Sequence, residues 1–311
     1  MMRHTRISSH SASVQSKGRW VAVSIIRKLV PATLKQHLEL FVARVARDGL
    51  QKARYTPWEG RMGRTAYAFD EGSFAVERKG EALPVPPPEL RMWYATESDE
   101  RFLEDGLAAA TSIRAILAEH GVTFGADSVC ADWGCASGRV LRHFAREAEV
   151  GEFWGLDQDE KYIMWDKANL SPPFKFLTST DYPHLPFEDN TFSFFYGISV
   201  FTHIENYPDL WLMEIRRVLR RGGYALFTAH AENTAAFFQE TGKPNWIPED
   251  IDLVEMGKHD AFVISHGEWY DKHVFYNTAF LRKEWGQYFE VVDFKPLAID
   301  GFHNAVLLRK P

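Results

Sequence analysis

The chain of 311 residues is long enough for one large domain with an appendage or for two domains, and either can bury a full core. Its content of 45% hydrophobic and 25% charged residues excludes a disordered chain and a collagen-like repeat. The two cysteines, Cys130 and Cys135, are too few for a disulfide-stapled secreted domain or for a cysteine-only zinc site, so no metal site is expected. We therefore expect a folded protein of the reducing cytoplasm.

The net charge of −6 is distributed unevenly along the chain. Residues 1–54 hold 11 Lys and Arg against only Glu39 and Asp48, a net charge of +9, so the remaining residues sum to −15. Because the acidic body would repel phosphates, this distribution disfavours nucleic acid as a partner.

Residues 1–54 form a basic N-terminal extension. Its serines and basic residues, with no acidic residue before Glu39, are typical of a transit peptide or of a disordered tail. The apolar run Val21–Val30 is interrupted by charges and too short to span a membrane. Between Leu34 and Leu50 the spacing predicts an amphipathic basic helix. Such a helix can either lie peripherally on an anionic membrane surface or pack on the main domain.

Residues 55–98 are rich in Gly and Pro and predict a connector, so the main domain is expected at 99–311. It begins with a predicted helix, Asp99–His120, after which strands and helices alternate. The predicted strands and helices after this first helix are Ser128–Trp133, Arg139–Glu147, Phe153–Leu156, Lys161–Leu170, Phe174–Leu177, Phe192–Ile198, Pro208–Arg220 and Tyr224–Thr228. This alternation predicts an α/β fold with a mostly parallel sheet covered on both faces, whose ligands bind at the carboxyl ends of the strands.

Small residues follow the first predicted strand, at Gly134, Ala136, Ser137 and Gly138. They let a ligand approach the backbone N–H groups at the start of a helix, although a tight turn would also favour such residues. A second signal is Asp157, which ends the second strand 19 residues after Gly138, where a carboxylate can accept hydrogen bonds from ribose hydroxyls.

The type of nucleoside is narrowed by what the loop lacks. A dinucleotide fingerprint would place glycines where Ala136 and Arg139 stand, so a pyrophosphate site is disfavoured. The chain also has no Walker-type Gly-Lys-Ser/Thr motif, so the sequence gives no indication of phosphoryl transfer.

From about Ser128 to the C-terminus the chain resembles the class I S-adenosylmethionine-dependent methyltransferases, particularly bacterial members with a Ser-Val-Phe-Thr-His loop. The segments that carry the resemblance occur in family order and are DWGCASG at 132–138, GLD at 155–157, Asp181 with LPF at 185–187, SVFTHI at 199–204 and WLMEIRRVLRRGG at 211–223. Ala136, Ser193 and Arg221 depart from the usual family residues.

The resemblance implies a Rossmann-like, doubly wound, seven-stranded sheet with an antiparallel last strand, the last two strands being Phe289–Lys295 and His303–Arg309. It also implies S-adenosylmethionine as the cofactor. The residues that it places around the cofactor are Asp132, Gly134 and Ala136 at the methionine end, Asp157 at the ribose, Asp181 and Tyr182 at the adenine, and Ser199 near the amino group. Gly138, in the same loop as Gly134, is also a candidate cofactor-binding residue.

Two histidines are candidate general bases, because a hydroxyl acceptor must lose a proton when it is methylated. His203 lies on the loop after the fourth strand, where it can also simply begin the next helix, and His230 follows the fifth strand.

The aromatic-rich insertion 231–288 can cover an acceptor such as a small molecule or a glycan, or it can form a satellite core. We favour O-methylation, with a non-catalytic cofactor-binding scaffold or a nicotinamide oxidoreductase as alternatives.

Overall fold

The computed structural model describes residues 82–91, 98–265 and 272–311. The expectations for the basic extension 1–54 and for most of the connector 55–98 therefore lie outside the described residues. Among the helices in the described ranges, none is long and apolar enough to cross a membrane.

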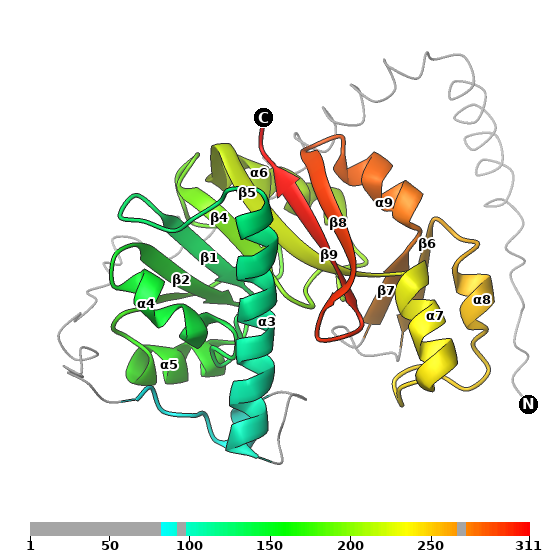
Figure 1. Ribbon diagram of the computed structural model, residues 1–311, viewed down its shortest axis with the longest axis horizontal. Coiled ribbons are helices and arrows are strands. Elements are labelled where there is room, and N and C mark those ends of the chain that lie inside the picture. Colours follow the sequence, from blue (N-terminus) through cyan, green and yellow to red (C-terminus); the bar gives the residue numbers. More distant parts are fainter. Residues whose placement is uncertain (1–81, 92–97, 266–271) are drawn as a thin grey trace, which may run out of the picture. The chain divides into compact units, whose positions relative to one another are not determined.

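A nine-stranded mixed sheet organises the described part of the chain (Figure 1). Five parallel strands follow the order β3-β2-β1-β4-β5, and the antiparallel strand β9 joins β5 to β8. These seven strands are β1 (Val129–Trp133), β2 (Glu152–Asp157), β3 (Lys175–Thr178), β4 (Phe192–Gly197), β5 (Leu219–Ala231), β8 (Glu290–Ile299) and β9 (His303–Arg309).

The predicted Rossmann-like α/β fold is confirmed, including its seven strands and its antiparallel last strand. The sheet gains two further strands from the insertion, β6 (Ala261–Ser265) and β7 (Lys272–Tyr276). These two strands were not predicted, because β7 pairs with the last residues of β5, which the sequence alone does not show to be part of a strand. β5 extends beyond the expected Thr228 to Ala231, and its last two residues pair with β7.

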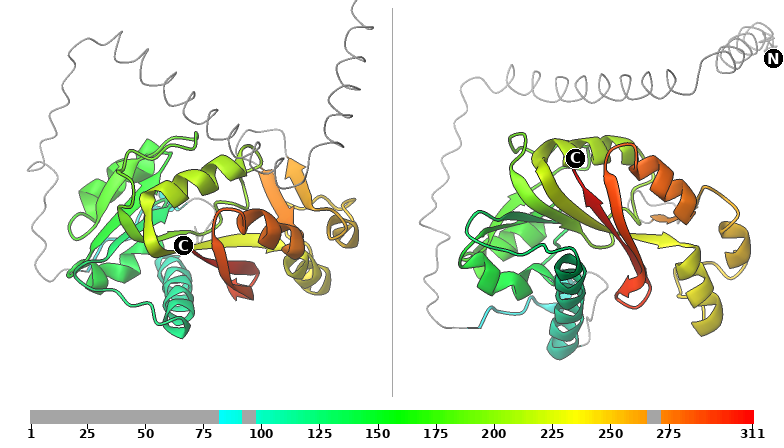
Figure 2. Two further views of the ribbon diagram at one scale, coloured as in Figure 1. Left: turned by 90° about the horizontal axis from the view of Figure 1, so that it is seen from above. Right: turned by 45° about the horizontal axis from the view of Figure 1, so that its top comes forward.

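Helices cover both faces of the sheet (Figure 2). The long helix α3 (Asp99–Glu119) lies on one face, and α6 (Pro208–Val218) lies on the opposite face. Between the strands run α5 (Glu160–Asn169), α9 (Thr278–Trp285) and the short segments η3 (Leu141–Phe144) and α4 (Ala145–Ala148). A single turn, η2 (Pro88–Leu90), precedes α3.

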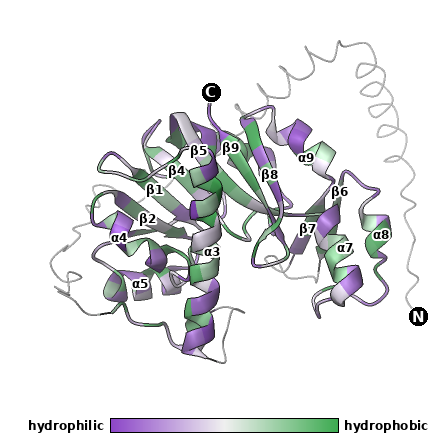
Figure 3. Ribbon diagram, viewed as in Figure 1, coloured by the Kyte–Doolittle hydropathy of each residue, from purple (hydrophilic) through white to green (hydrophobic). Residues whose placement is uncertain are grey.

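Both faces of the sheet are buried, because successive large apolar side chains along a strand point to opposite faces. On β4, Phe194 and Tyr196 join the core beneath α3, whereas Phe195 points to the other face. There it contacts Trp133, whose ring centroid lies 4.6 Å from that of Trp211 of α6, with the two rings tilted. In Figure 3 the strands in the middle of the sheet are mainly hydrophobic, while α3 carries hydrophilic and hydrophobic residues.

The helix predicted at Arg139–Glu147 is instead a 3₁₀ turn followed by one α-helical turn, η3 and α4. Leu141, Arg142 and Phe144 are all buried, so this segment is enclosed by protein on several sides. Arg142 donates hydrogen bonds to the backbone oxygens of Leu83 and Pro84. The helical periodicity of the sequence does not reveal this enclosure or these hydrogen bonds, so a longer α-helix was predicted.

The insertion folds into a second small core beside the end of β5. Its helices α7 (Glu232–Thr241) and α8 (Leu253–Met256) pack with the β6–β7 hairpin. The buried members of this core are Ala235, Phe238, Ile247, Leu253, Met256, Ile264 and Phe275.

Candidate functional site

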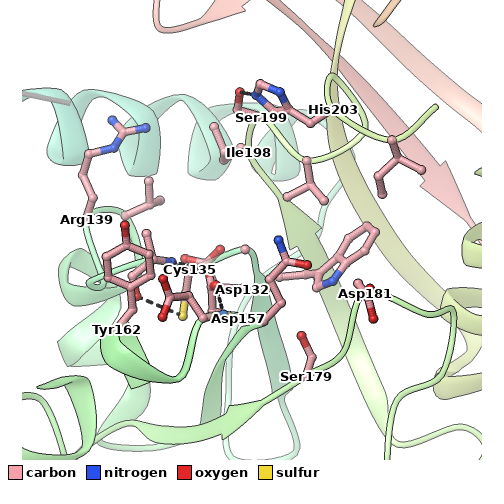
Figure 4. A pocket seen from close by; sticks show the side chains of 18 of the residues that line it. Asp132, Cys135, Arg139, Asp157, Tyr162, Ser179, Asp181, Ile198, Ser199 and His203 are labelled. Carbon is pink, nitrogen blue, oxygen red and sulfur yellow. Dashed lines mark hydrogen bonds between the residues drawn. The ribbon is translucent and has the colours of Figure 1, made fainter. Parts of the chain in front are cut away.

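A cavity of about 660 Å³ lies at the carboxyl ends of β1, β2 and β4 (Figure 4). Seven of the ten sequence-predicted site residues line it, from the ends of β1 and β2 and from the loops after β1, β3 and β4. They are Asp132, Gly134, Ala136, Asp157, Asp181, Ser199 and His203. The volume is within the range of small-molecule sites.

Asp157, at the end of β2, connects two loops at the floor of the cavity. One carboxylate oxygen accepts a hydrogen bond from the N–H of Ala136, and the other accepts one from the N–H of Asp159, both at 2.9 Å. Burial raises the pKa of Asp157, and these two backbone hydrogen bonds oppose the rise. Each oxygen has a second lone pair, so the carboxylate can still accept hydrogen bonds from a ligand.

The loop after β1 is held in a conformation that favours glycine. Gly134 has φ +75°, and a Cβ built on it would lie 2.6 Å from the Cγ2 of Val200, which also lines the cavity. Its N–H donates to the backbone oxygen of Leu156 at 2.7 Å. Ala136 has φ +46°, an uncommon conformation for a residue other than glycine, and such conformations concentrate at ligand sites.

Asp132 is buried at the end of β1, where the Tyr196 hydroxyl donates a hydrogen bond to its carboxylate at 2.9 Å. Burial raises the pKa of Asp132 to about 7, while the hydrogen bond from Tyr196 and the charge of Arg139 oppose the rise. This carboxyl group therefore changes charge close to neutral pH.

His203 lies at the cavity wall in a defined orientation. Its Nδ1 is 2.6 Å from the backbone oxygen of Lys272, and its Nε2 is 3.4 Å from the hydroxyl oxygen of Ser199. Because a carbonyl oxygen only accepts, Nδ1 must carry the proton, and Nε2 of the neutral ring is then the basic nitrogen. The β7 strand thus fixes the tautomer of His203.

Ser199 follows β4 with φ +59°, a second non-glycine residue in the left-handed region at this cavity. Its N–H donates to the hydroxyl of Thr228 at 2.6 Å, and its own hydroxyl lies 3.1 Å from that of Thr202. The backbone N–H of Ser199 therefore points to β5. We expected the backbone of Ser199 to approach the cofactor amino group. Because an amino group donates hydrogen bonds, only the carbonyl oxygen of Ser199 can serve this contact.

Three predicted residues do not line the cavity. Gly138 packs closely against Leu170, because a Cβ at this position would lie 2.4 Å from the Cδ1 of Leu170. Tyr182 is 47% exposed on the surface. His230 is buried beside the insertion core, with its ring stacked on those of Phe275 and His303 at 4.8 and 5.0 Å.

Several cavity residues were not predicted from the sequence. Arg139 was noted only as a departure from a dinucleotide motif, although its place directly after the loop was a signal that a cation stands near the ligand. Tyr162 of α5 and Lys272 of β7 carried no signal, because their positions depend on how distant elements pack.

The insertion contributes to the cavity wall through Lys272, which is paired with Glu205 of the loop after β4. Trp246 and Phe275 pack in the insertion core, and Trp246 stacks on His273 at 4.0 Å. His266, Trp269 and Tyr270 lie outside the described residues. For the described aromatic residues, the structure thus shows a satellite core.

A comparison with known protein families matches one part of the chain. Residues 131–227 match a family model described as a methyltransferase domain. A search of curated proteins found no match.

Solved structures with a similar fold include three methyltransferases. In the complex between the Haloferax volcanii Trm112 methyltransferase activator and a methyltransferase, the similar chain is 16% identical, with 72% of this chain and 98% of that chain covered and a TM-score of 0.50. An S-adenosylmethionine-dependent methyltransferase from Clostridium acetobutylicum is 13% identical, with 66% and 92% covered and a TM-score of 0.49. One from Mesorhizobium loti is 16% identical, with 65% and 98% covered and a TM-score of 0.48.

At 16% identity the likeness to the Haloferax structure shows the fold alone, and the family match shows the domain. Residues 131–227 contain the loop after β1, Asp157, Asp181, Ser199 and His203. The chain therefore contains a methyltransferase domain, on the fold of the S-adenosylmethionine-dependent methyltransferases.

Proposed function

We propose that the protein transfers a methyl group from S-adenosylmethionine to a hydroxyl group of a small-molecule or glycan acceptor. The observation that carries this proposal is the convergence of Asp132, Asp157 and His203, from three strand ends, on one cavity. A sulfonium cofactor supplies an electrophilic methyl group, so the protein mainly has to hold an acceptor in line and exclude water.

The chemistry of the cavity fits this cofactor. The carboxylate of Asp157 can accept hydrogen bonds from both ribose hydroxyls, and Asp181 stands where an adenine amino group can donate. At the other end, Asp132 can pair with the ammonium of the amino-acid part, beside the small residues of the loop after β1.

His203 is the proposed general base for a hydroxyl acceptor. Its ring lines the cavity, and the carbonyl of Lys272 holds the proton on Nδ1. Nε2 is therefore the nitrogen that can take the acceptor proton as the methyl group is transferred.

Two measurements test the proposed function. Calorimetry with S-adenosylhomocysteine should show binding, and a thermal-shift comparison should show stabilisation by S-adenosylmethionine but not by NAD. Methyl-labelled S-adenosylmethionine should then transfer label to members of a panel of sugars and phenols. Binding without any transfer would favour the scaffold alternative, and stabilisation by NAD alone would favour the oxidoreductase.

The first expected result concerns Asp157. Replacing Asp157 with Ala should weaken S-adenosylhomocysteine binding by about ten- to a hundredfold, because charge-assisted hydrogen bonds of roughly 1.5–3 kcal/mol are lost. Asp293→Ala, which removes a β8 carboxylate outside the cavity, is the matched control and should bind normally. Unchanged calorimetric affinity in Asp157→Ala would contradict the assignment.

The second expected result is a pH dependence of binding caused by Asp132. Burial raises the pKa of Asp132 to about 7, so the carboxylate is increasingly protonated as pH falls and loses its attraction for the ligand ammonium. The affinity for S-adenosylhomocysteine should therefore weaken about tenfold from pH 8 to pH 6.

Two variants isolate this effect. Asp132→Asn should bind more weakly and without this pH dependence. Tyr196→Phe removes the hydrogen bond that favours the ionised form, so its transition should move to higher pH. If both variants follow the wild-type curve, another group governs the pH dependence.

We also propose that residues 1–54 attach the protein reversibly to anionic membranes. Their net charge of +9 supports this, since each basic residue near such a surface contributes at most about 1 kcal/mol. The full chain should co-sediment with phosphatidylserine liposomes and be released by salt, whereas a chain starting at Tyr55 should not bind. Equal binding of both chains, or binding indifferent to salt, would contradict this role.

A further inference from the structure

Two side chains of opposite charge flank the loop after β1 and line the cavity. Asp132 ends β1, and Arg139 follows the loop after β1. The charge of Arg139 acts on the ionisation of Asp132, so the two groups lie within electrostatic reach of each other. An anion and a cation that line one cavity are complementary to a zwitterion such as the amino-acid part of S-adenosylmethionine.

Arg139 is also held from outside the cavity, by a residue of the β8–β9 turn. Asp300 places a carboxylate oxygen 3.3 Å from an Nη of Arg139, and the Nδ1 of His303 lies 3.7 Å from the same oxygen. The side chains of Arg139 and Asp300 are only 8% and 11% exposed, so solvent screens this ion pair weakly. Neither Asp300 nor His303 lines the cavity.

The backbone of this turn supports a specific role for Asp300. Asp300, the first residue of the turn, has φ +53°, and Leu297, at the irregularity in β8 before the turn, has φ +50°. Burial disfavours the charged form of Asp300, but the nearby His303 ring and the charge of Arg139 outweigh it, so the pKa of Asp300 is lowered. An ionised, nearly buried carboxylate that does not line the cavity thus pairs with Arg139.

Building on the proposed function, we propose that Arg139 binds the carboxylate of the cofactor's amino-acid part and that Asp300 is a positioning residue for Arg139. A guanidinium presents donors on more than one edge, so one edge can be held by Asp300 while another meets a ligand carboxylate. Without Asp300, Arg139 would be drawn to Asp132, and the two groups would neutralise each other instead of binding a zwitterion.

The test compares two ligands in each variant. Decarboxylated S-adenosylmethionine lacks only the carboxylate in question, so the ratio of its dissociation constant to that of S-adenosylmethionine measures recognition of this group. For the wild-type protein we expect a ratio of about ten to a hundred. Arg139→Gln should reduce the ratio to near one, because the carboxylate is no longer recognised; losing the charge of Arg139 also raises the pKa of Asp132, which weakens the binding of both ligands alike and does not change the ratio.

Asp300→Asn should give an intermediate ratio, although Asp300 does not touch the ligand. Asp293→Asn on β8 is the matched control and should keep the wild-type ratio. Because each ratio is measured within one variant, a partial loss of stability does not imitate the effect. If Asp300→Asn fails to fold, Arg139→Gln and Arg139→Lys still decide the matter, the lysine variant being expected to retain part of the preference.

The outcomes separate the two proposals. A preference that survives in Arg139→Gln, or an equal loss of affinity for both ligands, would overturn the role of Arg139. A wild-type ratio in folded Asp300→Asn would overturn the positioning role. If the wild-type protein binds both ligands equally, this inference fails while the proposed function stands, whereas binding of neither ligand would reject the proposed function itself.

Discussion

Replacing His203 with Asn should lower kcat by about 10²- to 10⁴-fold for an alcohol acceptor while leaving the affinity for S-adenosylhomocysteine within about twofold. Asparagine keeps an N–H that can donate to the Lys272 carbonyl, so the local structure is retained. What it removes is the basic Nε2. The measurement is steady-state transfer of labelled methyl to an acceptor that supports turnover, with calorimetry for cofactor binding.

The acceptor's own acidity provides an internal control for this prediction. A phenol needs less help in losing its proton than an alcohol, so the effect of His203→Asn should be smaller for a phenolic acceptor. Ser199→Ala, which removes the hydroxyl 3.4 Å from Nε2, should have an effect of less than about tenfold. A loss below tenfold in His203→Asn itself would indicate that His203 serves the local structure of the loop before α6.

The strands were predictable where their hydrophobic pattern is self-contained. His303–Arg309, which was placed with the help of the family resemblance, has the same bounds in β9, where its apolar side chains are buried on both faces of the sheet. The end of β5 was not predictable, since His230 and Ala231 become part of a strand only by pairing with Phe275 and Tyr276. This longer strand explains why His230 is buried beside the insertion core rather than in the loop expected after Thr228.

The site was predictable where the order of strands fixes position. Asp132, Asp157 and Ser199 each stand at or just beyond the carboxyl end of a parallel strand, so the fold brings them together without further information. The contacts of His203 with Lys272 and of Arg139 with Asp300 join residues 69 and 161 positions apart. Those contacts depend on how the β6–β7 and β8–β9 hairpins pack against the rest of the fold, and a local sequence pattern does not predict this packing.

The loop after β1 gives the second large expected effect. Gly134→Val should weaken S-adenosylhomocysteine binding by more than about a hundredfold, because its side chain would enter the space between this loop and Val200, where both line the cavity. The variant should also lose roughly 1–3 kcal/mol of unfolding free energy, since valine is strained at φ +75°.

Two variants separate the loss of space from the strain. Gly121 has φ +69° at the end of α3 with nothing within 4 Å of a Cβ, so Gly121→Val should lose similar stability in denaturant unfolding yet bind normally. Ala136→Gly relieves a left-handed conformation without adding atoms and should preserve binding. If Gly134→Val is unfolded by circular dichroism while Gly121→Val is folded, Gly134 is required for the fold itself, because the strain is matched in the two variants. If Gly134→Val is folded and binds normally, the loop is a tight turn that does not contact the cofactor.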